Sequence, residues 1–520
     1  MAVGSVVEAN KAVPLPPPPP AQITAYVVYT CIMAGSGGLM YGYDLVIAGG
    51  ISIMDDFLLK FYPNVYIHKK NAQEDNYCRY NNQVFQLFSS SLYLAALIAT
   101  FFASVVSKKL GRRATMLGAG MFFIVGTVIG TAAENLAMII TGRALLGCGI
   151  GFANQAVPVY LSEIAPPRIR GGLNILFGVY LTIGILSGNI VNYFAAKVHP
   201  WGWRLSLGIA GIPALLLTLC SLVIVETPSS LIERGKHEQA RDVLRRIRGT
   251  TEVLAELDEL IETSRRDSRR PSWESFREFF CERRHRGEMV VACMLPFFQQ
   301  VAGNDAILFY GTFLFKLAGF GDQASLYSAI ITGACAFLSC SSTILFIDRL
   351  GRRPLLLIGC ALMASSLVVV GSIFAATLQG DVRKLPLAES VTEVVMVCIF
   401  VIGFGVSLGP LAWLIPSEIL SQEVRSAGQS IAVFVNMLFK FIIAQTFLSM
   451  LCAFKFGIFF FFAGWSFVIA TFIILLLPET KQVPLHKMET LWQDHWFWKQ
   501  IVGPPSSPNP VYYSDPSPML

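Results

Sequence analysis

The sequence is poor in charge and lacks the residue patterns of most soluble enzymes. Asp, Glu, Lys and Arg together make up 14% of its 520 residues. No CxxC pair occurs among the eleven cysteines, and the six histidines show no metal-ligand spacing. No nucleophile–base set, phosphate-binding loop or basic patch interleaved with aromatic residues is present. These absences argue against an enzyme, a metal site, a bound cofactor and a nucleic-acid partner.

The N-terminus lacks the apolar core of a cleavable signal peptide. Residues 1–24 contain a run of prolines, which favours a short extended tail. We therefore expect the first apolar run after this tail to act as an uncleaved insertion signal.

Long apolar runs are what the sequence has in abundance. Hydrophobic residues make up 54% of the chain, including 38 Phe. A helix that crosses a bilayer needs about 20 apolar residues, and this length rule predicts an all-α membrane protein with twelve spans. The expected limits are 25–48, 84–106, 115–134, 137–159, 172–194, 203–225, 288–313, 324–347, 355–377, 392–416, 427–450 and 456–477.

The short loops that carry positive charge all fall on one side of these spans. The positive-inside rule places them, and both termini, in the cytoplasm. The residues concerned are Lys108, Lys109, Arg112, Arg113, Arg168, Arg170, Arg349, Arg352, Arg353 and Arg425.

Two long connections stand out. Residues 227–287 show apolar residues at helical spacing among charges, which predicts short amphipathic helices on the inner face. For the part after Arg265 a solvated linker is an equal alternative. The outer loop, about 52–82, contains Cys78, and Cys452 follows span 11 on the same side. The two could pair in an oxidising compartment, although the sequence does not fix the connectivity.

The two halves of the chain repeat each other. KKLGRRATM is answered by DRLGRRPLL, VETPSSL by LPETKQV, and VPVYLSEIAPPRIRGG by LIPSEILSQEVRSAGQ. The repeat predicts two six-helix bundles, 25–226 and 288–478, joined by 227–287 and followed by a cytoplasmic tail, 479–520. Arg and Glu at the inner mouths can bridge helix ends within and between bundles, forming a gate. The residues expected there are Glu163, Arg170, Arg112, Arg113, Asp348, Arg349, Arg352, Glu418 and Arg425. The alternative is that these loops only set topology.

One ionisable residue, Asp44, lies inside the first span. A carboxylate there costs a few kcal/mol or more, so such a residue persists when it has a partner or a task. Arg143 in span 4 is an obvious buried cation, and the second half has Cys398 at the equivalent point. The two residues predict either a proton-coupling pair or a static ion pair.

Several stretches carry a resemblance to a known family. They include GYD at 42–44, GRALLGCGIGFANQAVPVYLSEIAPPRIRGGLN, ETPSSLIERG, FFQQVAG, DRLGRRP, GPLAWLIPSEI, RSAGQS, VNMLF and LLPETK. From about 24 to 498 the chain resembles the sugar porters of the major facilitator superfamily, most of all the plant monosaccharide–proton symporters. In the first GRR motif, Lys108 and Lys109 stand where that pattern often has Asp and Arg.

The resemblance implies uptake of a monosaccharide, a hexose in the first instance, with protons across the plasma membrane. It gives Asp44 the role of proton carrier and Arg143 that of its modulator, and it implies a Cys78–Cys452 disulfide under an extracellular lid. The expected partners are the sugar, protons and the lipid bilayer, with a monomer as the working unit. Alternatives are a facilitative carrier of a sugar or polyol and a non-transporting sugar sensor, although the short tail argues against the sensor.

The family's sugar site maps onto residues of both halves. The resemblance carries over Gln299, Gln300, Trp413 and Asn436, with Tyr41 and Leu45 closing the apolar side. The amides could instead only pack between helices. This chain departs from the pattern at Gly178, Asp305, Ala336 and Lys440.

Asp305 and Lys440 carry opposite charges at positions that line the same site in the family. We expect them to form a buried pair, because either charge alone would be costly there. The alternative is that Lys440 extends its amine toward water.

Overall fold

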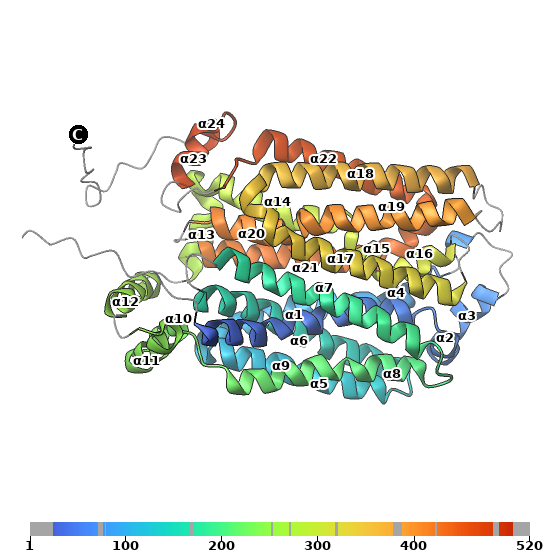
Figure 1. Cartoon of the computed structure of the whole chain (residues 1–520), viewed down its shortest axis with the longest axis horizontal. Coiled ribbons are helices and arrows are strands. Elements are labelled where there is room, and N and C mark those ends of the chain that lie inside the picture. Colours follow the sequence, from blue (N-terminus) through green and yellow to red (C-terminus); the bar gives the residue numbers. More distant parts are fainter. Residues whose placement is uncertain are drawn as a thin grey trace, which may run out of the picture.

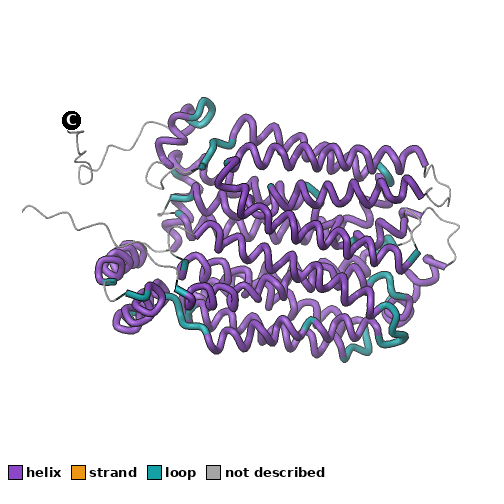
Figure 2. Tube along the Cα trace, in the orientation of Figure 1, coloured by secondary structure: helices purple, strands orange, loops and turns teal. Residues whose placement is uncertain are grey.

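The computed structural model is built of helices, with no strand in the part it describes (Figure 2). It describes residues 24–70, 76–78, 80–165, 170–250, 253–269, 272–317, 321–377, 387–421, 424–481 and 488–502. The first half contains α1 (Ala25–Ile51), α2 (Asp55–Phe61), α3 (Pro63–Lys70), η1 (Asn76–Cys78), α4 (Gln83–Leu110), α5 (Arg112–Thr131), α6 (Leu136–Ile164), α7 (Arg170–Ala195), α8 (Gly202–Ile209) and α9 (Gly211–Val223).

The linker and the second half follow. The linker consists of α10 (Pro228–Glu233), α11 (His237–Arg248), α12 (Leu254–Arg269), α13 (Ser272–Cys281) and η2 (Arg283–His285). The second half contains α14 (Arg286–Val301), α15 (Asn304–Phe309), α16 (Gly311–Leu317), α17 (Asp322–Leu350), α18 (Arg352–Thr377), α19 (Leu387–Val406), α20 (Leu408–Ile419), α21 (Arg425–Phe454) and α22 (Gly457–Leu476). The tail carries α23 (Met488–Asp494) and α24 (Lys499–Val502).

Eleven stretches of the described chain are long and apolar enough to cross a membrane. The seventh expected span, 288–313, is divided into α14, α15 and α16, so no single helix of that region has the full length. The first break falls at Gly303, whose φ of +86° is a left-handed conformation that favours glycine. Counted with this broken helix, the architecture matches the twelve predicted spans.

The spans form two bundles that lie side by side (Figure 1). In the first, α5 packs on α6, α4 on α6 and α1 on α7; in the second, α18 packs on α19 and α22, and α14 on α21. The bundles meet along two seams, α7 against α17 and α4 against α21.

The connections gather at the two ends of the bundles. The short helices α10–α13 and the tail helices α23 and α24 lie at one end, and the lid helices α2 and α3 lie at the other (Figure 1). The region after Arg265, for which a solvated linker was an equal alternative, continues as the end of α12 and as α13. The linker is attached to the first bundle, because Arg248 donates to the Ile164 carbonyl at 3.3 Å and Thr24 donates to the Ile247 carbonyl at 2.8 Å.

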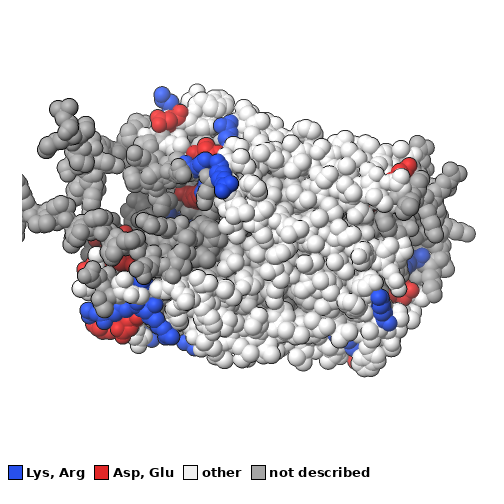
Figure 3. All heavy atoms as spheres, in the orientation of Figure 1, with Lys and Arg blue, Asp and Glu red and all other residues white. Residues whose placement is uncertain are grey.

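Charged side chains are confined to the two ends of the face in Figure 3, and a broad uncharged band separates them. Many large apolar side chains of the spans are exposed, such as Leu345 at 67% and Ile212 at 65%. A surface of this kind is stable against lipid tails and not against water. The chain is a multi-pass membrane protein.

Candidate functional site

The most deeply buried ion pair lies inside the first bundle. Arg143 on α6 donates from Nη1 to Asp44 Oδ1 on α1 at 2.6 Å, and the two side chains are 2% and 1% exposed. Replacing Arg143 by an uncharged residue would leave the Asp44 carboxylate without its counter-charge, at a cost of about 3–5 kcal/mol. The structure therefore joins the two residues expected to form the proton-coupling pair.

The surroundings of this pair allow Asp44 to change its charge. Its second oxygen, Oδ2, is buried and has no hydrogen-bond partner in the part of the chain that the structure describes. That oxygen is the one with free lone pairs for an incoming proton. Arg143 also donates from Nε to the Phe88 carbonyl at 3.2 Å, and its guanidinium lies 5.0 Å from the Phe88 ring centre. Phe88 therefore still holds the cation when Asp44 is neutral.

A second pair lies between the bundles. Lys440 Nζ on α21 is 2.6 Å from Asp305 Oδ2 on α15, and it also donates to the Tyr41 hydroxyl on α1 at 2.6 Å. The amine lies 5.1 Å from the Tyr41 ring centre and 5.6 Å from that of Tyr93 on α4. With its side chain 9% exposed, Lys440 is directed at these partners rather than at open water. The pair thus belongs to the second bundle and reaches the first through Tyr41.

The predicted sugar-site amides meet on the second bundle. Asn436 Nδ2 on α21 donates to Gln299 Oε1 on α14 at 2.7 Å, and Gln299 Nε2 donates to the carbonyls of Leu408 and Gly409 at 3.2 and 2.9 Å. These carbonyls lie just after Ser407, where α19 gives way to α20. Breaks in membrane helices are tolerated where the backbone is buried or lines a cavity, which suits a substrate site.

The other predicted sugar-site residues differ in their exposure. Gln300, Leu45 and Ala336 are buried, at 2%, 4% and 5% exposure. Gly178 lies on the seam between the bundles, where an added Cβ would be 3.4 Å from the Cys340 sulfur on α17. Trp413 is 39% exposed.

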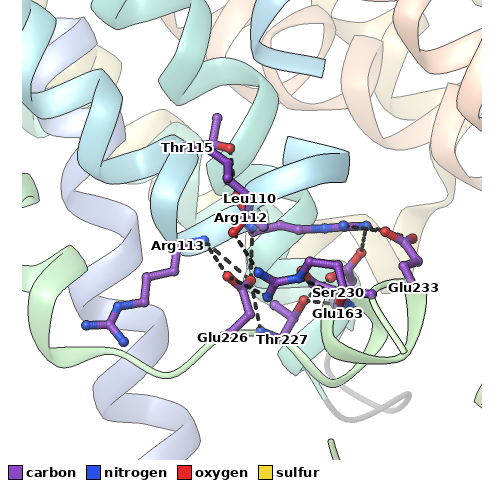
Figure 4. Close-up of polar contacts among 11 residues, drawn as sticks. Leu110, Arg112, Arg113, Thr115, Glu163, Glu226, Thr227, Ser230 and Glu233 are labelled. Carbon is purple, nitrogen blue, oxygen red and sulfur yellow. Dashed lines mark hydrogen bonds and ion pairs between the residues drawn. The ribbon is translucent and has the colours of Figure 1, made fainter. Parts of the chain in front are cut away.

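The end of the first bundle opposite α2 and α3, which the sequence predicts to be its inner mouth, holds a network of charges (Figure 4). Arg112 donates to Glu163 at 2.9 Å and to Glu233 at 2.6 Å. Glu226 accepts from the backbone N–H of Arg112 at 2.9 Å, at the start of α5, where a carboxylate is favoured by the helix dipole. Thr227 donates to the other oxygen of Glu163 at 2.5 Å.

The second inner mouth repeats this network. Arg352 donates to Glu418 at 2.8 Å, and Thr480 donates to Glu418 at the same distance. Glu479 accepts from the backbone N–H groups of Arg352 and Arg353, both at 2.9 Å, at the start of α18. Gly111 and Gly351 precede the two arginine helices with φ of +99° and +93°. Arg112–Glu163 and Arg352–Glu418 each join helices of one half, whereas Arg112–Glu233 ties the linker to the first half.

Two further predicted gate arginines also contact backbone carbonyls. The backbone N–H of Arg113 donates to Glu226 at 3.3 Å and its side chain donates to the Ser221 carbonyl at 2.8 Å, while Arg425 donates to the Leu420 carbonyl at 3.4 Å. The Arg349 side chain is exposed. The side chains of Arg170 and Asp348 lie outside the described residues.

Sequence reasoning missed five members of the inner networks, Glu226, Thr227, Glu233, Glu479 and Thr480. All but Glu233 stand in the repeated stretches VETPSSL and LPETKQV, so the repeat itself was a signal for them. Tyr41 was expected on the apolar side of the sugar site, and its hydroxyl contact with Lys440 had no signal in the sequence.

At the end of the molecule that carries α2 and α3, the bundles are tied by a disulfide between Cys78 and Cys452. Neutral side chains continue the tie along α4 and α21: Gln445 donates to Gln83 at 2.9 Å, and Gln86 donates to Ser449 at 3.0 Å. The lid is also fixed to the first bundle, where hydrogen bonding by Lys60 lowers the pKa of the exposed Glu134. The two bundles are thus connected covalently on the side of the lid.

The sequence of this chain is similar to those of known sugar transport proteins. Residues 30–492 match the family model described as "Sugar (and other) transporter". The chain is 54% identical to sugar transport protein MST4 of Oryza sativa subsp. japonica, with 93% of each chain covered. It is 53% identical to sugar transport protein 13 of Arabidopsis thaliana, with 93% of this chain and 92% of the relative covered.

The fold is also similar to that of solved transporter structures. The proton:xylose symporter XylE bound to 6-bromo-6-deoxy-D-glucose superposes with a TM-score of 0.75 at 25% identity, covering 91% of this chain and all of the other. The inward-open form of XylE from E. coli gives a TM-score of 0.70 at 24% identity, covering 90% and 100%.

Proposed function

The chain belongs to the sugar (and other) transporter family, and from that premise we propose that it carries a monosaccharide of the hexose class into the cell together with protons. The relatives from rice and Arabidopsis are named sugar transport proteins, and the similar solved structure is a proton:xylose symporter. The chain is a carrier and not an enzyme. We place it in the plasma membrane as a monomer with both termini in the cytoplasm.

One observation supports coupling above all others. Asp44 and Tyr41 lie about one turn apart on α1, so they share a face of that helix. Asp44 is paired with Arg143 of the first bundle, and Tyr41 is bonded to Lys440 of the second. A proton that arrives at Asp44 and a sugar that arrives beside Lys440 therefore act on the same stretch of α1.

The proposed cycle uses Asp44 Oδ2 as the proton acceptor. Protonation cancels the charge that attracts Arg143, and Phe88 retains the guanidinium. The loosened α1 can then follow the bundles as they rock, and the sugar is held by Gln299, Asn436 and their neighbours. Release of both cargoes inside restores the ion pair.

Uptake of radiolabelled glucose by transporter-deficient cells tests this function. We expect accumulation that a protonophore abolishes in the wild type. Asp44→Asn should equilibrate sugar without accumulating it, whether or not the protonophore is present. Accumulation that ignores the protonophore in the wild type would refute proton coupling.

The second candidate is a facilitative carrier of a sugar or polyol with altered specificity. The central charged pair is the observation that favours an altered specificity. Asp305 and Lys440 satisfy each other and Tyr41 where neutral hydrogen-bonding groups would otherwise face a sugar. Each lost neutral contact weakens binding by on the order of 1 kcal/mol. A panel of competing sugars and polyols measured in the same cells distinguishes a hexose carrier from a polyol carrier.

A further inference from the structure

Another buried carboxyl group in the spans is one that the proposed cycle does not use. Glu393 is in the second turn of α19, toward the end of the molecule that carries the lid, and it is 1% exposed. Its Oε2 atom is buried and has no hydrogen-bond partner among the described residues. Glu393 is thus about as deeply enclosed as Asp44, but no arginine in the described part of the chain is paired with it.

The helices around Glu393 offer no cation at its level. α17, α18 and α20 pack against α19. In the described parts of these helices, Lys and Arg occur only at the inner ends, as Arg349, Arg352 and Arg353. The remaining ionisable groups of these helices carry no positive charge. They are Cys335, Cys340 and Tyr327 on α17, Cys360 on α18, Glu389 and Cys398 on α19, and Glu418 at the inner end of α20; the side chains of Asp322 and Asp348 lie outside the description.

The internal repeat sets Glu393 beside the proton site of the other half. When the halves are aligned on Glu163 and Glu418, α19 corresponds to the first part of α6, and Cys398 falls opposite Arg143. Glu393 then lies between one and two turns from that point, toward the lid. Each bundle therefore has an ionisable residue in the outer part of its fourth span. Arg143 is neutralised by Asp44, whereas Glu393 has no partner of opposite charge among the described residues.

An isolated carboxylate in such surroundings is strongly disfavoured, and the group takes up a proton instead. From this placement we propose that Glu393 is a second proton-binding group of the carrier. It holds a proton in the conformation described here and releases it to outside water when rocking exposes the outer end of α19. The O–H bond of the carboxylic acid breaks, the proton passes to water, and the carboxylate remains solvated. The inference rests on the rocking cycle of the proposed function.

The release gives transport a pH dependence that is separate from that of Asp44. At alkaline external pH, the ionised Glu393 must be reprotonated before α19 can pack again, because burying the charge is costly. Closure of the outer side should slow as a result. The effect does not require net proton movement, so it persists when Asp44 cannot titrate.

Sugar exchange at equilibrium in proteoliposomes separates the two groups. We expect Asp44→Asn carriers to lose exchange as external pH rises from about 5 to about 9, with a limiting slope of about tenfold per pH unit. In Asp44→Asn/Glu393→Gln the exchange rate should not depend on external pH, because glutamine resembles the neutral carboxylic acid and does not titrate. Asp44→Asn/Glu389→Gln is the matched control, since Glu389 lies one turn away on α19 and is only half-buried; it should keep the pH dependence. Two results overturn the proposal: an exchange rate in Asp44→Asn that does not change with pH, or a pH dependence that adding Glu393→Gln leaves unchanged.

Infrared difference spectroscopy tests the protonated state without transport. The wild type at neutral pH should show a carboxylic-acid C=O band that is missing from Glu393→Gln and retained in Glu389→Gln. If the band is unaffected by Glu393→Gln, Glu393 is ionised and the proposal is wrong. If Asp44→Asn shows no exchange at all, the proposed function fails on that point, and the infrared band still decides the state of Glu393.

Discussion

The two bundles are alike at their inner mouths and unlike at their centres. At the mouths, Arg112 with Glu163 and Arg352 with Glu418 form matching pairs, and Glu226 and Glu479 cap the matching helices. At the centres, the first bundle encloses Asp44–Arg143 completely, whereas the second presents Asp305–Lys440 to the other bundle. The duplicated parts hold helix ends together, and the unduplicated parts carry the charges that a proton or a sugar could meet.

The difference also separates what each central pair can do. Asp44–Arg143 has a free carboxylate oxygen and a second set of partners for the cation, so it can lose its charge without losing its structure. Lys440 is already shared between Asp305 and Tyr41. It is therefore suited to hold the two bundles in a defined relation and to shape the predicted sugar site.

Reversing the second central pair should have the largest effect. Lys440→Asp or Asp305→Lys alone places two like charges together, which we expect to destabilise the carrier by about 3–5 kcal/mol and to abolish uptake. Thermal unfolding in detergent measures the loss. The double reversal Asp305→Lys/Lys440→Asp should recover most of the stability. Equal damage in all three variants would show that the pair does not act as a unit.

Neutralising the repeated caps should have a smaller and equal effect. Glu226→Gln and Glu479→Gln each remove a negative charge from the start of an arginine helix, at a cost of about 1 kcal/mol. Thermal unfolding should therefore shift by the same amount in both variants. A shift in one variant alone would mean that the two mouths are alike in geometry and different in energy.

The smallest effect is expected at the lid. Breaking Cys78–Cys452 should loosen the outer end and admit water toward Asp44, which favours its charged form. The apparent KM for protons should then rise a few-fold on reduction or in Cys452→Ser. Cys281→Ser alters an exposed free thiol and serves as the control. If reduction leaves the apparent KM for protons unchanged, the lid does not control access of water to Asp44.

Much of the fold followed from the sequence, because apolar length and the inner charges are local signals. The break in the seventh span could not be predicted, because hydropathy carries no information about the backbone conformation at Gly303. Asp44 and Arg143 were found because an ionisable residue in an apolar span is conspicuous. Glu393 did not stand out in the same way, because it lies near the end of a predicted span, where carboxylates are common. The bond from Lys440 to Tyr41 joins residues far apart in the chain and depends on how the bundles meet.

Direct measurement of proton movement tests the central claim that Asp44 carries the coupled proton. Glucose added to proteoliposomes with a pH-sensitive dye inside should acidify the lumen with wild-type carriers. Asp44→Asn carriers should bind and exchange glucose and leave the internal pH unchanged. Glucose-driven acidification that survives in Asp44→Asn would contradict the account.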